Sequence, residues 1–345
     1  MAEQKSGQMM GRRDFLKVST VLFGFAVLGA NFMSGCSGKA EKYPSGTIEV
    51  VVPTSEGGTT DQLARAHGQV WAELLGAKAF SYSFYPGAAG EVAYSLFAKK
   101  TADGYTLLFG NIEAEGVMYV LQKPDSFKID DFIFMNTLSK DPAVILVRKD
   151  APWPGLKELI EEGQKRKLNM GVSRWGSLDT VAGIILGKQT GANINVVPYG
   201  GGNKARVALL NGEIDFLMTK LAAALSIKDS VRFLAMVQDE NPYPSLSDNC
   251  PPINKVLGTQ VPEVASTRNW VVHKALKEKY PDRYQLLAKT AEEAFRSSKF
   301  QEALKKVGQP LELYTKYIGE EQTMKYLQQV LKTAAEYQDI LKANK

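Results

Sequence analysis

The stretch VVPTSEGGTTDQLAR, residues 51–65, has the order of a strand, a turn and a helix. The apolar run that ends at Val52 is typical of a buried strand, and helical spacing resumes at Gln62. Glycines in the turn and N-cap candidates at the helix start fill the positions between them: Gly57, Gly58, Thr59, Thr60 and Asp61. A helix start carries free N–H groups and a partial positive charge. The corner therefore predicts either a place for a small anion or a plain capped helix after a glycine turn.

The same order recurs along the chain, which predicts an α/β fold. We expect strands at residues 47–53, 79–85, 104–110, 143–150, 168–172, 194–198, 213–219, 231–237 and 266–274. We expect helices between these strands and an almost entirely helical segment at 275–345. Residues 241–264, rich in Pro, Ser and Asn, are expected to form loops. The pattern predicts two parallel-sheet lobes with a cleft between their strand-end loops and a helical tail packed on one lobe.

The expected division has two crossings between the lobes. Residues 46–140 begin lobe 1, residues 141–265 form lobe 2, and residues 266–345 complete lobe 1 with helices. We expect the chain to cross near residues 137–143 and again near 264–269.

Composition excludes several classes of protein. The 345 residues are 44% hydrophobic and 23% charged, values typical of a globular protein. The net charge of +5 is spread along the chain, so nucleic-acid binding gains little support. Two cysteines, Cys36 and Cys250, form neither a disulfide framework nor a metal-ligand pattern. We expect no metal, no cofactor and a monomer.

The N-terminus has the pattern of an export signal. Arg12 and Arg13 precede Phe-Leu-Lys in a twin-arginine pattern, and an apolar run of about 13 residues follows. Small residues before Cys36 are similar to a lipobox, in which the thiol is lipidated. We expect residues 1–35 to be a twin-arginine lipoprotein signal and residues 36–45 a tether; the alternative is an N-terminal membrane anchor with a chance cysteine.

Two further turns resemble the first. GVSRWGS, residues 171–177, places small donors, a guanidinium and an indole before an apolar helix. Arg174 offers a bidentate, charge-assisted contact to a carboxylate, although a surface arginine explains it equally well. PYGGGNKAR, residues 198–206, contains three glycines in a row but neither a Walker A loop nor a G-x-G-x-x-G motif.

Catalytic patterns are missing from the sequence. His67 and His273 are the two histidines, and we expect each to be structural or on the surface. An exported hydrolase using Ser173 or Ser177 remains an alternative, but the chain shows no matched His and Asp context for it.

Several motifs together resemble the substrate-binding receptors of tripartite tricarboxylate transporters, the Bug family. The matching segments, in chain order, are YPS (43–45), VVP (51–53) with GG (57–58) and TD (60–61), PGAAG (86–90), ADGYTLL (102–108), LN (168–169) with Gly171, VPY (197–199) with Gly201, and NGEID (211–215). The resemblance covers nearly the whole chain after the signal.

The resemblance implies a two-lobed periplasmic binding protein, similar to type II, that closes on a small organic carboxylate and delivers it to membrane transporter subunits. A receptor that signals to a sensor kinase or chemoreceptor is the alternative. It also implies which residues bind the ligand: Thr54, Ser55, Glu56, Gly57, Gly58, Thr59, Thr60, Asp61, Asn111, Ser173, Arg174, Trp175, Gly176, Ser177, Tyr199, Gly200, Gly201, Thr219 and Trp270.

Three departures from the family pattern affect the choice of ligand. Thr54, Ser55 and Glu56 replace Phe, Pro and Ala in the first turn, residues 172–178 are bulkier and charged, and Thr219-Lys220 replaces Asp-Asn. Arg174 or Lys220 is thus a candidate partner for a carboxylate. Glu56 is expected to meet an amine or to pair with Arg174.

Overall fold

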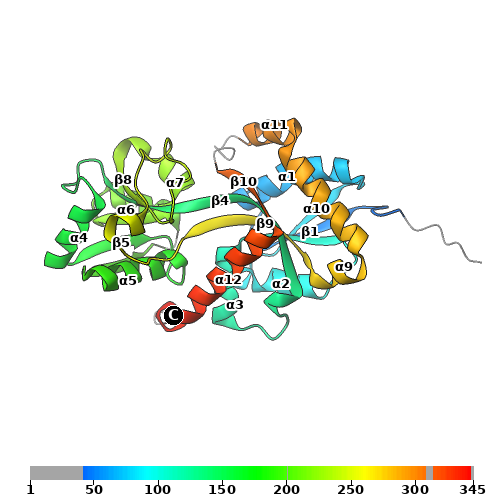
Figure 1. Ribbon diagram of the computed structural model, residues 1–345, viewed down its shortest axis with the longest axis horizontal. Coiled ribbons are helices and arrows are strands. Elements are labelled where there is room, and N and C mark those ends of the chain that lie inside the picture. The colour runs from blue at the N-terminus through cyan, green and yellow to red at the C-terminus, as the bar shows by residue number, and fades with distance from the viewer. Residues whose placement is uncertain (1–41, 200, 308–313, 343–345) are drawn as a thin grey trace, which may run out of the picture. The chain divides into compact units, whose positions relative to one another are not determined.

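Strands and helices alternate through most of the fold, as the apolar pattern predicts (Figure 1). The computed structural model describes residues 42–199, 201–307 and 314–342. Its strands are β1 (Ile48–Val52), β2 (Phe80–Phe84), β3 (Thr106–Gly110), β4 (Phe132–Arg148), β5 (Leu168–Val172), β6 (Ile194–Pro198), β7 (Phe216–Lys220), β8 (Val231–Met236), β9 (Ala265–His273) and β10 (Thr315–Gly319). Its α-helices are α1 (Thr59–Leu75), α2 (Glu91–Ala98), α3 (Ile112–Gln122), α4 (Leu156–Lys165), α5 (Leu178–Thr190), α6 (Gly202–Leu210), α7 (Leu221–Leu225), α8 (Ile253–Leu257), α9 (Lys274–Lys279), α10 (Pro281–Arg296), α11 (Ser298–Lys306), α12 (Glu320–Glu336) and α13 (Gln338–Lys342).

The strands form two sheets that share β4. Sheet A contains β2, β1, β3, β9 and residues 132–142 of β4, with β10 on β4 as well. Sheet B contains residues 143–148 of β4 with β7, β5, β6 and β8. Parallel pairs join β1 to β2 and β3, and β5 to β6 and β7. The prediction of parallel sheets is therefore right for β1 with β2 and β3 and for β5 with β6 and β7. It is wrong for the pairs made by β4, β8, β9 and β10, which are antiparallel.

The long strand β4 passes from one sheet to the other. Its sequence is apolar at both ends and polar at Ser139, Lys140 and Asp141. Pro142 pairs with the first residue of β9, and from Ala143 the strand pairs with β7. The division into lobes at residues 46–140, 141–265 and 266–345 stays a prediction. The chain is predicted to cross between the lobes near residues 137–143, which belong to β4, and near residues 264–269, most of which belong to β9.

Strand β1 and helix α1 form as the sequence of residues 47–75 predicts. The β-branched residues of β1 favour the extended conformation, and Gly57 takes a positive φ of 82° in the turn. The N-cap of α1 is Gly58, without a side-chain cap, so the prediction of Thr59, Thr60 or Asp61 as the cap is wrong. All three lie in the first turn, where the Asp61 carboxylate accepts a hydrogen bond of 2.8 Å from the Gly57 N–H.

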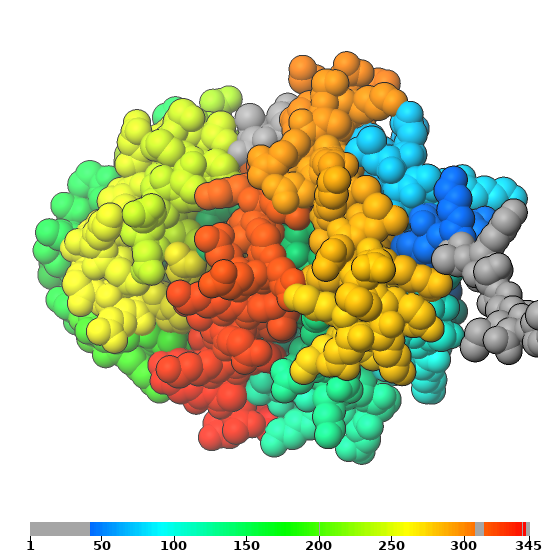
Figure 2. All heavy atoms as spheres, turned by 45° about the vertical axis from the view of Figure 1, so that its right-hand side comes forward, coloured from blue at the N-terminus to red at the C-terminus, as the bar shows by residue number. Residues whose placement is uncertain are grey.

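Helices cover both faces of each sheet. On sheet A, alternate residues of β1 separate the two faces: Ile48, Val50 and Val52 pack with α1, α10 and α11, whereas Val51 faces the core that includes α2, α3 and α12. The second of these cores continues beneath sheet B to α4 and α5, and α6 and α7 cover the other face of sheet B. Figure 2 shows α12, in red, on the face turned to the viewer. Residues of the sheet B half lie to its left, and the helices α9 and α10 lie to its right.

The C-terminal region departs from its prediction in one element. Residues 315–319, expected to be helical, form β10 and pair with residues 136–139 of β4. Residues 42–45, the described part of the predicted tether, pack against the folded part of the chain. The Tyr43 hydroxyl donates to the Gly104 carbonyl over 2.7 Å. Residues 1–35 and Cys36 lie outside the described residues. Among the helices that the structure describes, none has the length and apolar character needed to cross a membrane.

Candidate functional site

A cavity of about 650 Å³ lies where sheet A and sheet B share β4. Strands of both sheets and the helices α1, α6 and α7 contribute residues to its wall. The lining residues are Thr59, Ser139, Asp141, Asn203, Arg206, Lys220, Ala222, Ala223, Leu225, Ser226, Ser266, Arg268 and Tyr314. Thr59 follows β1 and Lys220 ends β7, so the cavity includes carboxyl ends of parallel strands, where α/β proteins bind ligands.

Positive charge predominates among these lining side chains. The described residues of the lining include three basic side chains, Arg206, Lys220 and Arg268, and one acidic side chain, Asp141. A second hollow of about 470 Å³, beside α12, has the opposite balance, with Asp239, Glu263 and Glu336 against Lys332. The first cavity is therefore the better match for an anionic ligand.

Arg268 hydrogen-bonds to uncharged groups of the cavity wall, and one of its N–H groups has no partner among the described residues. Its Nη1 donates to the Ser266 hydroxyl over 2.8 Å and to the Thr267 carbonyl over 2.7 Å, both neutral acceptors. Its Nε is buried without a hydrogen-bond partner among the described residues. Burial lowers the pKa of the guanidinium, an effect that the Asp141 charge opposes. A guanidinium with a free N–H is suited to a carboxylate.

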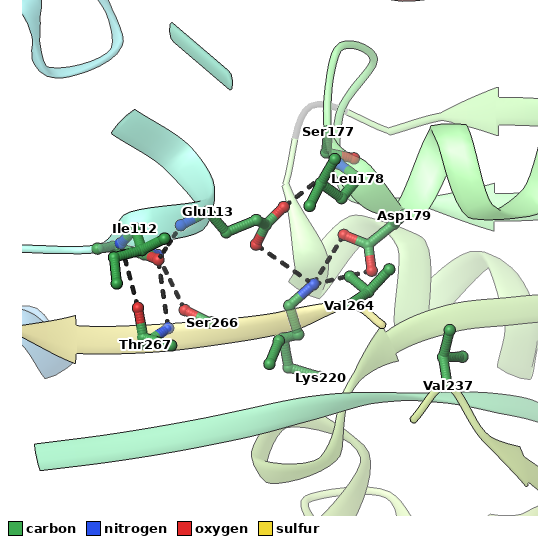
Figure 3. A network of polar contacts seen from close by, with 12 residues as sticks. Ile112, Glu113, Ser177, Leu178, Asp179, Lys220, Val237, Val264, Ser266 and Thr267 are labelled. Carbon is green, nitrogen blue, oxygen red and sulfur yellow. Dashed lines mark hydrogen bonds and ion pairs between the residues drawn. The ribbon is translucent and has the colours of Figure 1, made fainter. Parts of the chain in front are cut away.

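Lys220 differs because carboxylates already surround it (Figure 3). Its Nζ lies 2.8 and 2.9 Å from the two carboxylate oxygens of Asp179 at the start of α5. A third carboxylate oxygen, from Glu113 in the first turn of α3, is 3.6 Å away. Burial disfavours the charge on Lys220, but Asp179 and Glu113 outweigh this effect and raise its pKa. The group is a buried cluster that joins α3 to α5 and β7.

Two acidic groups near the cavity, Asp141 and Glu115, have raised pKa values. Burial raises the pKa of Asp141 to about 6, although the Ala222 N–H and the charge of Lys220 act in the opposite direction. Burial also raises the pKa of Glu115 to about 8, against hydrogen bonds from the Asn111 N–H and the Tyr94 hydroxyl. Glu115 is therefore largely protonated at neutral pH, which reduces the negative charge near Arg268.

Residues 54–61 of the first predicted turn divide between surface, cavity and structural roles. Ser55, Gly57 and Gly58 are exposed, and Thr59 lines the cavity. The Glu56 carboxylate pairs with Arg65 at 2.9 Å, so the expected pairing with Arg174 is wrong. Arg65 also binds Asp61 at 2.5 Å, which gives Asp61 a structural role in α1. Thr60 is buried, and Thr54 has a buried hydroxyl without a partner among the described residues.

The second and third predicted turns lie side by side. The Gly201 N–H donates to the Ser173 carbonyl over 2.7 Å, and the Tyr199 N–H donates to the Val172 carbonyl. Ser177 caps α5 by accepting from the Thr180 N–H. Arg174 is exposed, Gly176 takes a positive φ of 72°, and Gly200 lies outside the described residues. The Trp175 indole nitrogen is buried and has no partner among the described residues.

The remaining predicted residues have different surroundings. Asn111 caps α3, and its side chain donates to the Ser266 hydroxyl at the cavity wall. Thr219 precedes Lys220 in β7 and pairs with Val144. Trp270 belongs to the aromatic core of sheet A, where it is fully buried and its indole N–H donates to His67. Its prediction as a cleft residue is therefore wrong, because the side chain points to the face of β9 that packs on α1.

Several residues of the cavity wall are not predicted from the sequence. They are Ser139, Asp141, Ser266 and Arg268, whereas the sequence does make Lys220 a candidate partner for a carboxylate. The signal that points to them is polar side chains inside otherwise apolar strands, at residues 139–141 of β4 and 266–268 of β9. Only the antiparallel pairing of β4 with β9 brings these two short segments together, with Asp141 opposite Ser266.

Comparison with known proteins identifies the family. Residues 75–342 match the model of the tripartite tricarboxylate transporter family receptor, TctC. A UPF0065 protein of Bordetella pertussis is 32% identical over 197 residues, which are 56% of this chain and 61% of that protein. Protein BugT of the same organism is 26% identical over 76% of this chain and 81% of its own length.

Solved structures show the fold. A TctC solute-binding protein from Polaromonas, crystallised without ligand, has a TM-score of 0.73 and 21% identity over 87% of this chain and 99% of its own. Rhodopseudomonas palustris proteins solved with adipate and with malate have TM-scores of 0.63 and 0.60, at 24% and 23% identity. Each of the two covers 87% of this chain, which covers 97% of the first and 100% of the second. The likeness shows the two-lobed α/β fold of periplasmic binding proteins. This chain belongs to the tripartite tricarboxylate transporter receptor family, TctC, whose members include the Bug proteins.

Proposed function

We propose that this protein is an extracytoplasmic receptor that captures a small organic carboxylate and delivers it to a tripartite tricarboxylate-type membrane transporter. Family membership supports this role, and the relatives solved with adipate and malate supply the ligand class. The observation that carries the proposal is the cavity between sheets A and B, which Arg268 lines and whose described lining residues include more basic than acidic side chains. The protein binds and releases its ligand without chemical conversion.

Closure around the ligand follows from the position of the cavity. A carboxylate that contacts Arg268 in sheet A and groups of sheet B, such as the predicted turn at residues 173–177, stabilises the arrangement in which both sheets contact it. Ligand binding then shifts the population from open to closed forms, and the transporter recognises the closed form. The predicted ligand-binding turns, residues 54–61 and 199–201, belong to the same proposal.

Calorimetry on the full chain tests the carboxylate role. We expect malate, adipate or citrate to bind, and the uncharged diamide of adipate not to bind. In the Arg268→Gln variant the affinity for the best carboxylate should fall about tenfold to a hundredfold, since a hydrogen bond to a charged group is worth about 1.5–3 kcal/mol.

Arg296→Gln serves as the matched control. Arg296 lies on α10, where it pairs with Glu292 at the surface. This variant should retain the affinity of the parent protein. If no carboxylate binds, or if both arginine variants bind equally well, the proposed role of the cavity is wrong.

Export and anchoring form a separate part of the proposal. We infer that Arg12 and Arg13 direct twin-arginine export and that the Cys36 thiol is lipidated, which holds the receptor near its membrane partner. The Cys36→Ser variant should then move from the membrane fraction to the soluble extracytoplasmic fraction, with loss of the lipid mass in mass spectrometry. Equal fractionation of both proteins would contradict the anchor.

A further inference from the structure

The Glu113 carboxylate reaches from α3 to Lys220, which lines the cavity, and to the start of α5, where Leu178 lines the second hollow. One of its oxygens accepts a hydrogen bond from the Leu178 N–H at the start of α5, over 3.3 Å. The other lies 3.6 Å from the Lys220 Nζ. Glu113 is itself buried, at 6% exposure. The side chain thus places a carboxylate against a helix N-terminus and a cation, the two kinds of group that bind a free carboxylate in water-poor sites.

The two carboxylates that share Lys220 are held unequally. Asp179 contacts the ammonium through both oxygens at 2.8 and 2.9 Å, within the ordinary range for such bonds. Both contacts of Glu113 are longer than this range, and Glu113 comes from a different sheet half (Figure 3). Glu113 is therefore the partner that leaves more readily when the two halves move or when another carboxylate arrives.

Lys220 connects this cluster to the cavity. The same residue that contacts Glu113 and Asp179 also lines the 650 Å³ space that contains Arg268. A carboxylate that enters the cavity and approaches Lys220 meets the charge of Glu113 at close range. Like charges a few ångströms apart in a partly buried site repel each other strongly, so the two carboxylates exclude each other.

We propose that Glu113 is a tethered competitor of the ligand: its carboxylate occupies the contact to Lys220 that a ligand carboxylate takes when it binds. This inference rests on the proposed function and adds a specificity determinant to it. A bound ligand would place one carboxylate near Arg268 and a second at Lys220, where it displaces Glu113. The affinity for a ligand then depends on how much more strongly its carboxylate binds at Lys220 than the Glu113 carboxylate does.

Calorimetry with malate and adipate tests this competition in the full chain. The Glu113→Gln variant keeps the shape of the side chain but removes its charge, so it should bind the better probe at least about tenfold more tightly than the parent protein. Glu113→Ala, which removes the carboxylate entirely, should change affinity in the same direction. Circular dichroism and the melting temperature without ligand establish that each variant is folded.

Glu91→Gln is the matched control, since Glu91 also lies in the first turn of a helix on sheet A and its loss changes net charge equally. It should leave affinity within about twofold of the parent protein, because Glu91 lines no part of the cavity. If the parent binds and the two Glu113 variants bind equally or more weakly, Glu113 is not a competitor and the proposed function stands. If neither parent nor variants bind any carboxylate, the proposed function fails and this inference fails with it.

Discussion

At the scale of single residues, two buried glutamates near the cavity differ in their partners. Glu115 and Glu113 lie two positions apart in α3, yet they have different partners. Glu115 accepts hydrogen bonds from the Asn111 N–H at 2.5 Å and the Tyr94 hydroxyl at 3.2 Å, both on the sheet A side. Glu113 instead contacts a cation on the sheet B side. One helix turn thus carries Glu115, whose raised pKa favours the protonated form, and Glu113, whose carboxylate pairs with Lys220.

The raised pKa of Glu115 predicts a pH-dependent stability. Between its ordinary value of 4.5 and about 8, the folded protein holds a proton that the unfolded chain has released. The free energy of unfolding therefore falls as pH rises through this interval, by at most about 1.4 kcal/mol per pH unit. Glu115→Gln has no such proton, so denaturant unfolding from about pH 5 to about pH 8 should show a flatter profile for this variant.

His67 makes the comparison with the variant necessary. Burial lowers the pKa of His67 to about 4, so its contribution to stability rises with pH between about 4 and 6.5, opposite to that of Glu115. Because both proteins contain His67, its contribution cancels in the difference between their profiles. Parallel profiles for the parent protein and Glu115→Gln would show that Glu115 titrates normally.

At the scale of elements, the packing of α3 against α12 depends on a glycine. A Cβ added at Gly116 would lie 2.8 Å from Cγ1 of Val330, a β-branched side chain with little freedom to move. Overpacking costs typically about 1–3 kcal/mol, more than the helix propensity that alanine adds. We expect Gly116→Ala to lower the free energy of unfolding by about 1–2 kcal/mol in denaturant titrations.

Gly202 at the start of α6 provides the comparison. A Cβ there would meet Nη1 of Arg206 at 3.6 Å, which is ordinary contact. Gly202→Ala should leave stability unchanged or raise it slightly. A loss of similar size in both variants would assign the effect to glycine replacement in general and not to the α3–α12 contact.

The local sequence pattern predicts most helices and strands. It does not predict a strand whose extended form depends on pairing with a strand far away in the sequence. Strand β1 and helix α1 were predictable because a β-branched run and helical spacing are local properties. Strand β10 was not, because its extended form depends on pairing with β4, which lies far earlier in the chain. The same reason explains the site: Arg268 and Asp141 belong to separate strands, and only the β4–β9 register brings them to one cavity.

At the scale of the whole molecule, the two sheets are expected to unfold together. Strand β4 belongs to both, and one hydrophobic core runs from α2 and α3 to α4 and α5. We expect a single thermal transition for the folded part of the chain, with equal calorimetric and van't Hoff enthalpies.

The four tryptophans of the chain can report separately on the unfolding of the sheet A half and the sheet B half. Trp71 and Trp270 pack in the core of sheet A, whereas Trp153 and Trp175 lie on the sheet B side. Single-tryptophan variants that report on one half each should show the same midpoint. Midpoints that differ clearly between the halves would show that the sheets unfold independently.

The place of β9 in sheet A also constrains when that sheet forms during protein synthesis. Strand β9 lies between β3 and β4, although most of the sheet B elements separate it from β3 along the chain. A growing chain that has not reached His273 leaves the edges of β3 and β4 open, and open edges pair readily with other chains. Sheet A is thus completed only when most of the polypeptide has left the ribosome.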